Sequence, residues 1–233
     1  MNNRVDFKVW GRYALFTDPL SKIGGEKCSY HIPTYEALKG IISSIYWKPT
    51  FMWVVERVRI MKKIQTESKS MKPLDYGGGN SLAYYTYLSD VEYQVQAHFE
   101  WNLKRPDMEK DRIEPKHYEV AKRMIKKGGR RDIFLGTREC QGYAETCVFG
   151  EEKGVYDEAG ELAYGVMFHG FEYPDESGTN KLIGRFWKPV MKNGNVEFLP
   201  PEKCLTRKEI REMSPKPPNS SGLQEEGLLN ELD

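Results

Sequence analysis

Two patterns of hydrophobic and polar positions alternate along the first 150 residues. Residues 35–47 and 115–127 carry apolar side chains at the i, i+3, i+4 spacing of amphipathic helices. Four other segments are rich in β-branched and aromatic residues, or alternate apolar with polar positions, as strands do: 5–16, 51–64, 82–101 and 132–150. The elements therefore run in the order β-α-β-β-α-β, with 82–101 either one bent strand or a hairpin.

The ends of both helices carry local signals. Thr34 is a good N-cap, and Pro49 stops the first helix near Lys48. Pro115 suits the first position of the second helix, and Gly128–Gly129 ends it. The order and the caps predict an α+β fold, a ferredoxin-like (RRM-like) domain with two helices on one face of an antiparallel sheet.

The remainder of the chain changes in composition. Residues 151–213 contain strand-like pieces separated by turn residues, which predicts a small antiparallel β-sheet domain after a first domain of residues 1–150. Residues 214–233 are rich in Pro, Ser and Gly and carry four acids against one base. That composition is typical of a disordered acidic tail.

Composition narrows the class of protein. The chain has 233 residues, 39% of them hydrophobic, and no window of about 18 apolar residues that could span a membrane. No signal-peptide pattern precedes the first strand, and the four cysteines are scattered, which favours a cytoplasmic protein with reduced thiols. Neither the cysteines and histidines nor the carboxylates form a ligand cluster, so we expect no metal site and no cofactor.

The net charge of +1 conceals a strongly basic segment. Residues 120–131 contain six bases and no acid, and a glycine-containing stretch with Arg138 follows. Such a patch favours a polyanion such as RNA, although a solvated helix face would have the same composition. The candidate RNA-binding residues are Lys122, Arg123, Lys126, Lys127, Arg130, Arg131 and Arg138.

Lys116 and His117 begin the second helix and could carry chemistry. A helix N-terminus attracts phosphate, and a histidine there can exchange a proton near neutral pH. Antiparallel packing of the two helices would bring Tyr46, at the end of the first, near this pair. Together the three residues could cleave RNA without a metal, because the 2′-OH is an internal nucleophile. The alternative is an ordinary polar first turn.

Over residues 3–212 the chain resembles the CRISPR-associated proteins of the RAMP superfamily, specifically the fifth Cas family in its subtype I-C (d) variant. The stretches that carry the resemblance are "FKVWGRYALFTDP", "KCSYHIPTYEALKGIISSIYWKPTF", "HFEWN", "DRIEPKHYEVAKRMIKKGGRRDIFLGTRECQGY" and "GVMFHGFEYPDE".

The resemblance implies a metal-independent endoribonuclease that cuts the repeat hairpin of precursor CRISPR RNA and leaves a 2′,3′-cyclic phosphate. It also implies that the protein keeps the 5′ handle of the mature RNA and joins the backbone and large subunits of a type I-C interference complex, which contacts target DNA. The family's catalytic tyrosine and Lys-His pair correspond to Tyr46, Lys116 and His117. Either Tyr46 or His117 could be the general base. The alternative function is a non-catalytic subunit that only holds the handle; a DNA-directed protein is disfavoured.

Overall fold

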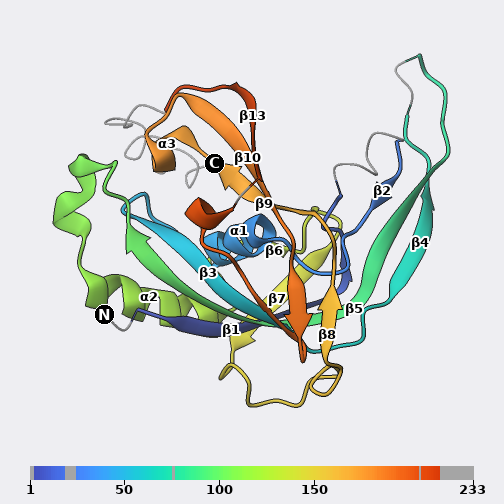
Figure 1. Cartoon of the computed structure of the whole chain (residues 1–233), viewed down its shortest axis with the longest axis horizontal. Helices are drawn as coiled ribbons and strands as arrows, with labels where there is room; N and C mark the ends of the chain where they lie inside the picture. Colours follow the sequence, from blue (N-terminus) through green and yellow to red (C-terminus); the bar gives the residue numbers. More distant parts are fainter. Residues whose placement is uncertain (1–2, 19–24, 75–76, 205, 216–233) are drawn as a thin grey trace, which may run out of the picture.

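The computed structural model describes residues 3–18, 25–74, 77–204 and 206–215. The first part of the chain forms an antiparallel sheet whose central strands lie in the order β7-β1-β5-β3. The bounds of these strands are Val5–Ala14 (β1), Phe51–Ile60 (β3), Ala83–Trp101 (β5) and Gln141–Thr146 (β7). Helices α1 (Tyr35–Ile45) and α2 (Glu114–Lys127) connect them (Figure 1). The predicted α+β, ferredoxin-like class is thereby confirmed.

Alternation along the strands places the core on the helical face of this sheet. Phe7 and Val9 of β1 pair with Val95 and Tyr93 of β5, and all four side chains are buried. The helices cover this face with a matching apolar stripe, which is made by Tyr35, Leu38, Ile41, Ile42 and Ile45 of α1 and by His117, Ala121 and Ile125 of α2. One of these buried residues, His117, is polar, and it leads to the candidate site.

Residues 82–101 form one strand rather than a hairpin. β5 extends over 19 residues and bends at Asp90, whose φ of 50° lies in the left-handed region. After Asp90 β5 pairs with β3 and with most of β1, and before it β5 pairs with the end of β1, with β4 (Thr66–Met71) and with the short β2 (Lys27–Cys28). Strands β2 and β4 and the first part of β5 make the arm that projects from the sheet in Figure 1.

The chain after residue 150 contributes to two sheets. Strands β12 (Asn195–Glu197), β11 (Val190–Lys192) and β8 (Glu161–Ala163) extend the large sheet beyond β3. Strands β9 (Met167–Glu172), β10 (Lys181–Trp187) and β13 (Thr206–Glu212) form a separate three-stranded sheet. A four-residue helix, α3 (Pro174–Ser177), joins β9 to β10, and a short 3₁₀ turn, η3 (Pro201–Lys203), precedes β13.

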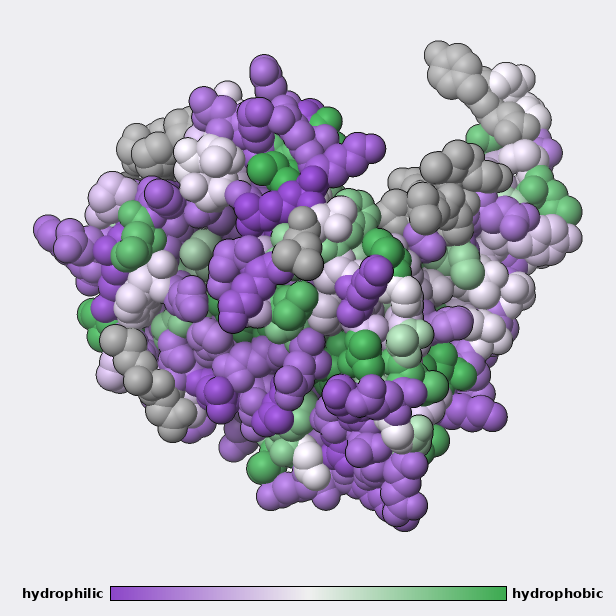
Figure 2. Space-filling model, viewed as in Figure 1, coloured by the Kyte–Doolittle hydropathy of each residue, from purple (hydrophilic) through white to green (hydrophobic). Residues whose placement is uncertain are grey.

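The domain boundary at residue 150 remains a prediction, as does the tail, of which only residues 214 and 215 are described. The surface in Figure 2 is mainly hydrophilic with scattered apolar residues. In the described part of the chain no helix is long and apolar enough to cross a membrane.

Local details shift some predicted boundaries. The segment 132–150 is two short strands, β6 (Ile133–Phe134) and β7, separated by a turn. Helix α2 begins at Glu114, one residue before the predicted start, and is preceded by a 3₁₀ helix, η2 (Pro106–Asp111). His117 N–H therefore donates to Ile113 O at 3.2 Å and is not free to bind phosphate. Thr34 caps α1, and Gly128 ends α2 with φ 86°, as predicted.

Candidate catalytic site and nucleic-acid interface

Tyr46 and His117 meet where α1 ends and α2 begins. The Tyr46 hydroxyl lies 2.8 Å from Nδ1 of His117. Tyr46 is the C-cap of α1, where its N–H donates to Ile42 O, and its own carbonyl accepts a bond of 2.7 Å from Nε1 of Trp53. Because its backbone is bonded on both sides, the Tyr46 ring is held against His117 by the sheet as well as by the helix.

The environment of His117 assigns the proton positions on its ring. Nε2 lies 2.6 Å from the backbone carbonyl of Asp111, and a carbonyl oxygen can only accept, so Nε2 carries a proton. In the neutral ring Nδ1 is then an acceptor, and Tyr46 donates its hydroxyl proton to it. The side chain is completely buried, with the rings of Phe51 and Trp101 at 5.3 and 5.8 Å. The two ring nitrogens of His117 are therefore bonded to Tyr46 on one side and to Asp111 on the other.

Asp111 holds the other elements of the site together. Its carboxylate accepts from Nζ of Lys116 at 2.5 Å and from Oγ1 of Thr50 at 2.7 Å, and Nε2 of His117 lies 3.4 Å from Oδ2. Partial burial acts to raise the pKa of Asp111, but the bonds from Lys116 and Thr50 and the nearby His117 outweigh it and lower the pKa. Asp111 is thus an anion that orients its neighbours.

The sequence did not single out Asp111. It is one of several acids in the charged connection that leads to α2, and neither spacing nor periodicity separates it from Asp107 or Glu109. Only the turn of η2, which brings residue 111 back over the start of α2, distinguishes it.

The adjacent Lys116 and His117 point in different directions. Successive helical residues are about 100° apart, so His117 enters the core while the Lys116 side chain stays 52% exposed. Burial raises the pKa of Tyr46, the charge of Asp111 raises it further, and Arg130 opposes them. Lys116 is not among the groups that shift this pKa, and the net direction is upward, which favours His117 over Tyr46 as the general base.

The seven predicted RNA-binding side chains are all exposed, but they do not form one patch. Lys122, Arg123 and Lys126 line a groove between α2 and the β1–β7 edge, about 440 Å³ in volume. Lys127 follows them at the end of α2, and Arg138 lies in the turn between β6 and β7.

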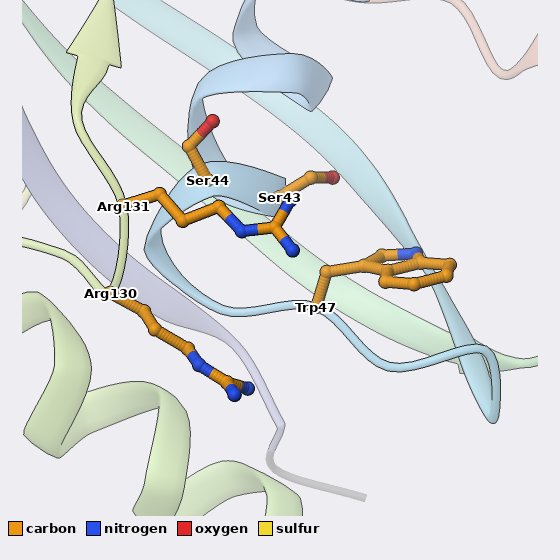
Figure 3. Close-up of a pocket in the computed structure, with 5 residues that line it drawn as sticks. All are labelled: Ser43, Ser44, Trp47, Arg130 and Arg131. Carbon is orange, nitrogen blue, oxygen red and sulfur yellow. The ribbon is translucent and has the colours of Figure 1, made fainter. Parts of the chain in front are cut away.

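Arg130 and Arg131 lie at the C-terminal end of α1, beside Tyr46. Their backbone N–H groups donate to the carbonyls of Ile45 and Ser44, both at 3.1 Å. Their side chains line a depression of about 190 Å³ together with Trp47 and the hydroxyl-bearing Ser43 and Ser44 (Figure 3).

Within the described ranges, no three His, Cys, Asp or Glu side chains are grouped so that they could hold a metal ion. The reactive groups of the site are thus a phenol, an imidazole, an ammonium group and the guanidinium groups beside them.

Comparison with solved structures places this fold among the CRISPR-associated proteins. A structure described as that of a CRISPR-associated protein is 37% identical, covers 88% of this chain and 96% of its own, and has a TM-score of 0.74. A functionally uncharacterized protein from Streptococcus mutans is 39% identical over 88% of this chain and 96% of its own, with a TM-score of 0.75.

The family follows from the sequence comparisons. The model of the CRISPR-associated Cas5d family matches residues 5–199, and the chain belongs to this family. Two relatives are named CRISPR pre-crRNA endoribonuclease Cas5d. The relative from Mannheimia succiniciproducens is 31% identical over 86% of this chain and 96% of its own. The relative from Thermus thermophilus is 30% identical over 77% of this chain and 78% of its own. The resemblance recognised in the sequence is confirmed.

Proposed function

We propose that this protein is an endoribonuclease that cleaves precursor CRISPR RNA within the repeat, without a metal ion, by attack of a 2′-OH on the adjacent phosphate. The observation that carries the proposal is the Tyr46–His117 hydrogen bond. It places the hydroxyl of Tyr46, which is 4% exposed, against Nδ1 of the completely buried His117, in a family whose curated relatives are named as endoribonucleases for this RNA.

The proposed first step is a proton relay. Tyr46 accepts the proton of the substrate 2′-OH as its own proton passes to Nδ1 of His117. His117 then carries protons on both nitrogens, and its Nε2 faces the Asp111 carbonyl and the Asp111 carboxylate, which stabilise the cation. Since burial raises the pKa of Tyr46, the phenol stays neutral before the reaction, and the imidazole supplies the basicity.

The 2′-oxygen forms a bond to phosphorus, and the bond from phosphorus to the 5′-oxygen breaks. The products are a 2′,3′-cyclic phosphate and a 5′-hydroxyl, whose oxygen takes its proton from solvent. Negative charge accumulates on the phosphorane oxygens during this step. The half-exposed ammonium group of Lys116 is the proposed stabiliser of that charge.

The basic surfaces support a role that continues after cleavage. We propose that the α2 groove holds the 5′ handle, and that the protein then serves as a subunit of the type I-C interference complex with the backbone and large subunits. The seven exposed bases supply the sequence-independent phosphate contacts. Contact with target DNA would arise through that complex.

A second candidate function rests on the complete burial of His117. A buried, bonded Tyr–His pair can also be a purely structural feature, in which case the protein would bind the handle without cutting. Cleavage is the property that separates the two functions.

The test uses the purified protein and a synthetic repeat RNA in EDTA. We expect cleavage of the all-ribose RNA, a cyclic phosphate on the upstream product, and no cleavage when the nucleotide at the cut site is 2′-deoxy. Cleavage that requires a divalent metal, or that proceeds on the deoxy substrate, would refute the mechanism. Tight binding without any cleavage would instead favour the handle-binding function.

A further inference from the structure

Trp47 is an exposed aromatic side chain at the edge of the candidate catalytic site. It follows Tyr46 directly in the chain, yet its side chain is on the surface, where 51% of the residue is exposed, while Tyr46 is 4% exposed. A tryptophan left half in solvent loses the benefit of burying its large apolar ring, unless a ligand covers it.

Two arginines and two serines surround Trp47. Figure 3 shows the Arg131 side chain extending across the depression toward Ser43, with the Trp47 ring beside it. The carbonyls at the end of α1, which would repel a phosphate, are already bonded to the backbone N–H groups of Arg130 and Arg131. Among the described residues neither arginine forms a salt bridge, so both guanidinium groups are available to an anion.

The depression lies close to Tyr46 in the chain and in space. Trp47 follows Tyr46 directly, and the N–H of Arg130 donates to the carbonyl of Ile45, the residue before Tyr46, at 3.1 Å. Arg130 also acts to lower the pKa of Tyr46. A nucleotide held here would therefore lie next to the 2′-OH that Tyr46 is proposed to deprotonate.

An exposed ring matches a base, and two guanidinium groups without a salt bridge match a phosphate. The hydroxyls of Ser43 and Ser44 donate to the carbonyls of Lys39 and Gly40, which leaves their oxygens as acceptors for a ribose hydroxyl.

We infer that this depression is a nucleotide subsite of the RNA-binding surface: Trp47 stacks on one base of the single-stranded RNA beside the cleavage point, and Arg130 and Arg131 hold the phosphate next to it. This inference rests on the proposed function, and it adds a base-binding residue and a location. The subsite accepts any base, because stacking on an indole does not read hydrogen-bonding edges.

The experiment compares Trp47→Ala, Trp47→Phe and a matched control, Tyr143→Ala. Tyr143 is 54% exposed, but it lies on β7 beside Trp10, on the sheet face opposite the helices. Affinity is measured with repeat RNA that carries one 2′-deoxy nucleotide at the cleavage position, or with unmodified RNA if the wild-type protein does not cut it.

We expect Trp47→Ala to weaken binding about tenfold or more, and Trp47→Phe to stay within about threefold, since stacking on aromatic rings carries the affinity. Tyr143→Ala should bind like the wild type. Arg131→Ala should lower the slope of log affinity against log salt by about 0.7.

Three results would overturn the subsite: Trp47→Ala within about twofold of the wild type, Trp47→Phe as weak as Trp47→Ala, or an equal loss in Tyr143→Ala. Failure of the proposed function looks different, because the wild-type protein would then bind RNA without cutting it, and the affinity comparison would still decide the subsite. Wild-type protein that binds no repeat RNA would overturn both.

Discussion

The relay from Tyr46 to His117 predicts that the two side chains act as a unit. Tyr46→Phe removes only the hydroxyl and keeps the ring contact with Phe51, whose centroid lies 5.6 Å away. His117→Gln keeps a side-chain donor for the Asp111 carbonyl and avoids the cavity that alanine would leave among the surrounding rings. Each change should lower the single-turnover cleavage rate by about 10²–10⁴-fold, the usual contribution of general acid–base catalysis.

The informative variant is the double substitution. In a relay, loss of either residue stops the same proton transfer, so the double variant should be about as slow as the slower single variant. Two residues acting independently would multiply their losses, to about 10⁴-fold or more. Multiplied losses, or a Tyr46→Phe enzyme with nearly full rate, would refute the relay.

The stability effect of Tyr46→Phe must be separated from its effect on the rate. The variant leaves Nδ1 of His117 buried without a donor, which should cost about 1–3 kcal/mol of unfolding free energy. Tyr35→Phe is a matched control at the other end of α1, because Tyr35 is also buried and the backbone of Val55 acts on its hydroxyl, opposing the rise of its pKa. We expect denaturant titrations to show similar losses of stability, while only Tyr46→Phe loses cleavage.

Three further predictions concern charge. Asp111→Asn should cost no more than about 1 kcal/mol at neutral pH, because its ion pair with Lys116 is partly exposed. Since the pKa of Asp111 is lowered from 3.8 in the folded protein, the difference from wild type should be constant above pH 3.8 and shrink steadily as pH falls below it; a difference in denaturant titrations that does not shrink there would contradict the assignment. Burial and the charge of Arg185 lower the pKa of His169 from 6.5 to about 4. The contribution of the neutral His169 to the unfolding free energy is therefore fully present above pH 6.5, and the unfolding free energy should fall by about 3 kcal/mol as pH drops from 6.5 to about 4. His169→Gln should flatten that fall in urea titrations between pH 7 and 4.5, and an unchanged pH profile would refute the assignment. Replacing both Lys122 and Lys126 with Ala should weaken RNA binding and reduce the salt slope by about 1.4, whereas an unchanged slope would exclude the α2 groove.

The fold was predictable as far as local signals and element order reach. Thr34 and Gly128 mark helix ends by side-chain and backbone chemistry that depends on few neighbours, and both predictions are confirmed. The strands after residue 150 were different. Their alternation indicates strands but carries no information on which sheet each joins, and the pairing of β12 with β3 is a contact between residues more than 130 positions apart.

The single strand β5 shows the same limit at short range. Ser89–Asp90 has the composition of a turn, and Asp90 does adopt a left-handed φ of 50°. However, β1 and β4 pair with the two halves of β5, so tertiary pairing continues the strand through a residue that would otherwise end it.

At the site, the predicted topology places Tyr46 near the start of α2, and the structure shows which side chain it contacts. The sequence does not indicate which of the adjacent residues Lys116 and His117 faces the core and which faces solvent. Because α2 begins one residue earlier than Pro115 suggests and packs through His117, the imidazole lies inside the core and the ammonium group outside. In order of exposure, the Lys116 side chain (52%) comes first, then Tyr46 (4%), and then the completely buried His117. That order is the physical reason to expect the phenol to touch the substrate and the imidazole to store its proton. The same order explains why a rate loss in His117→Gln requires no direct contact between His117 and RNA.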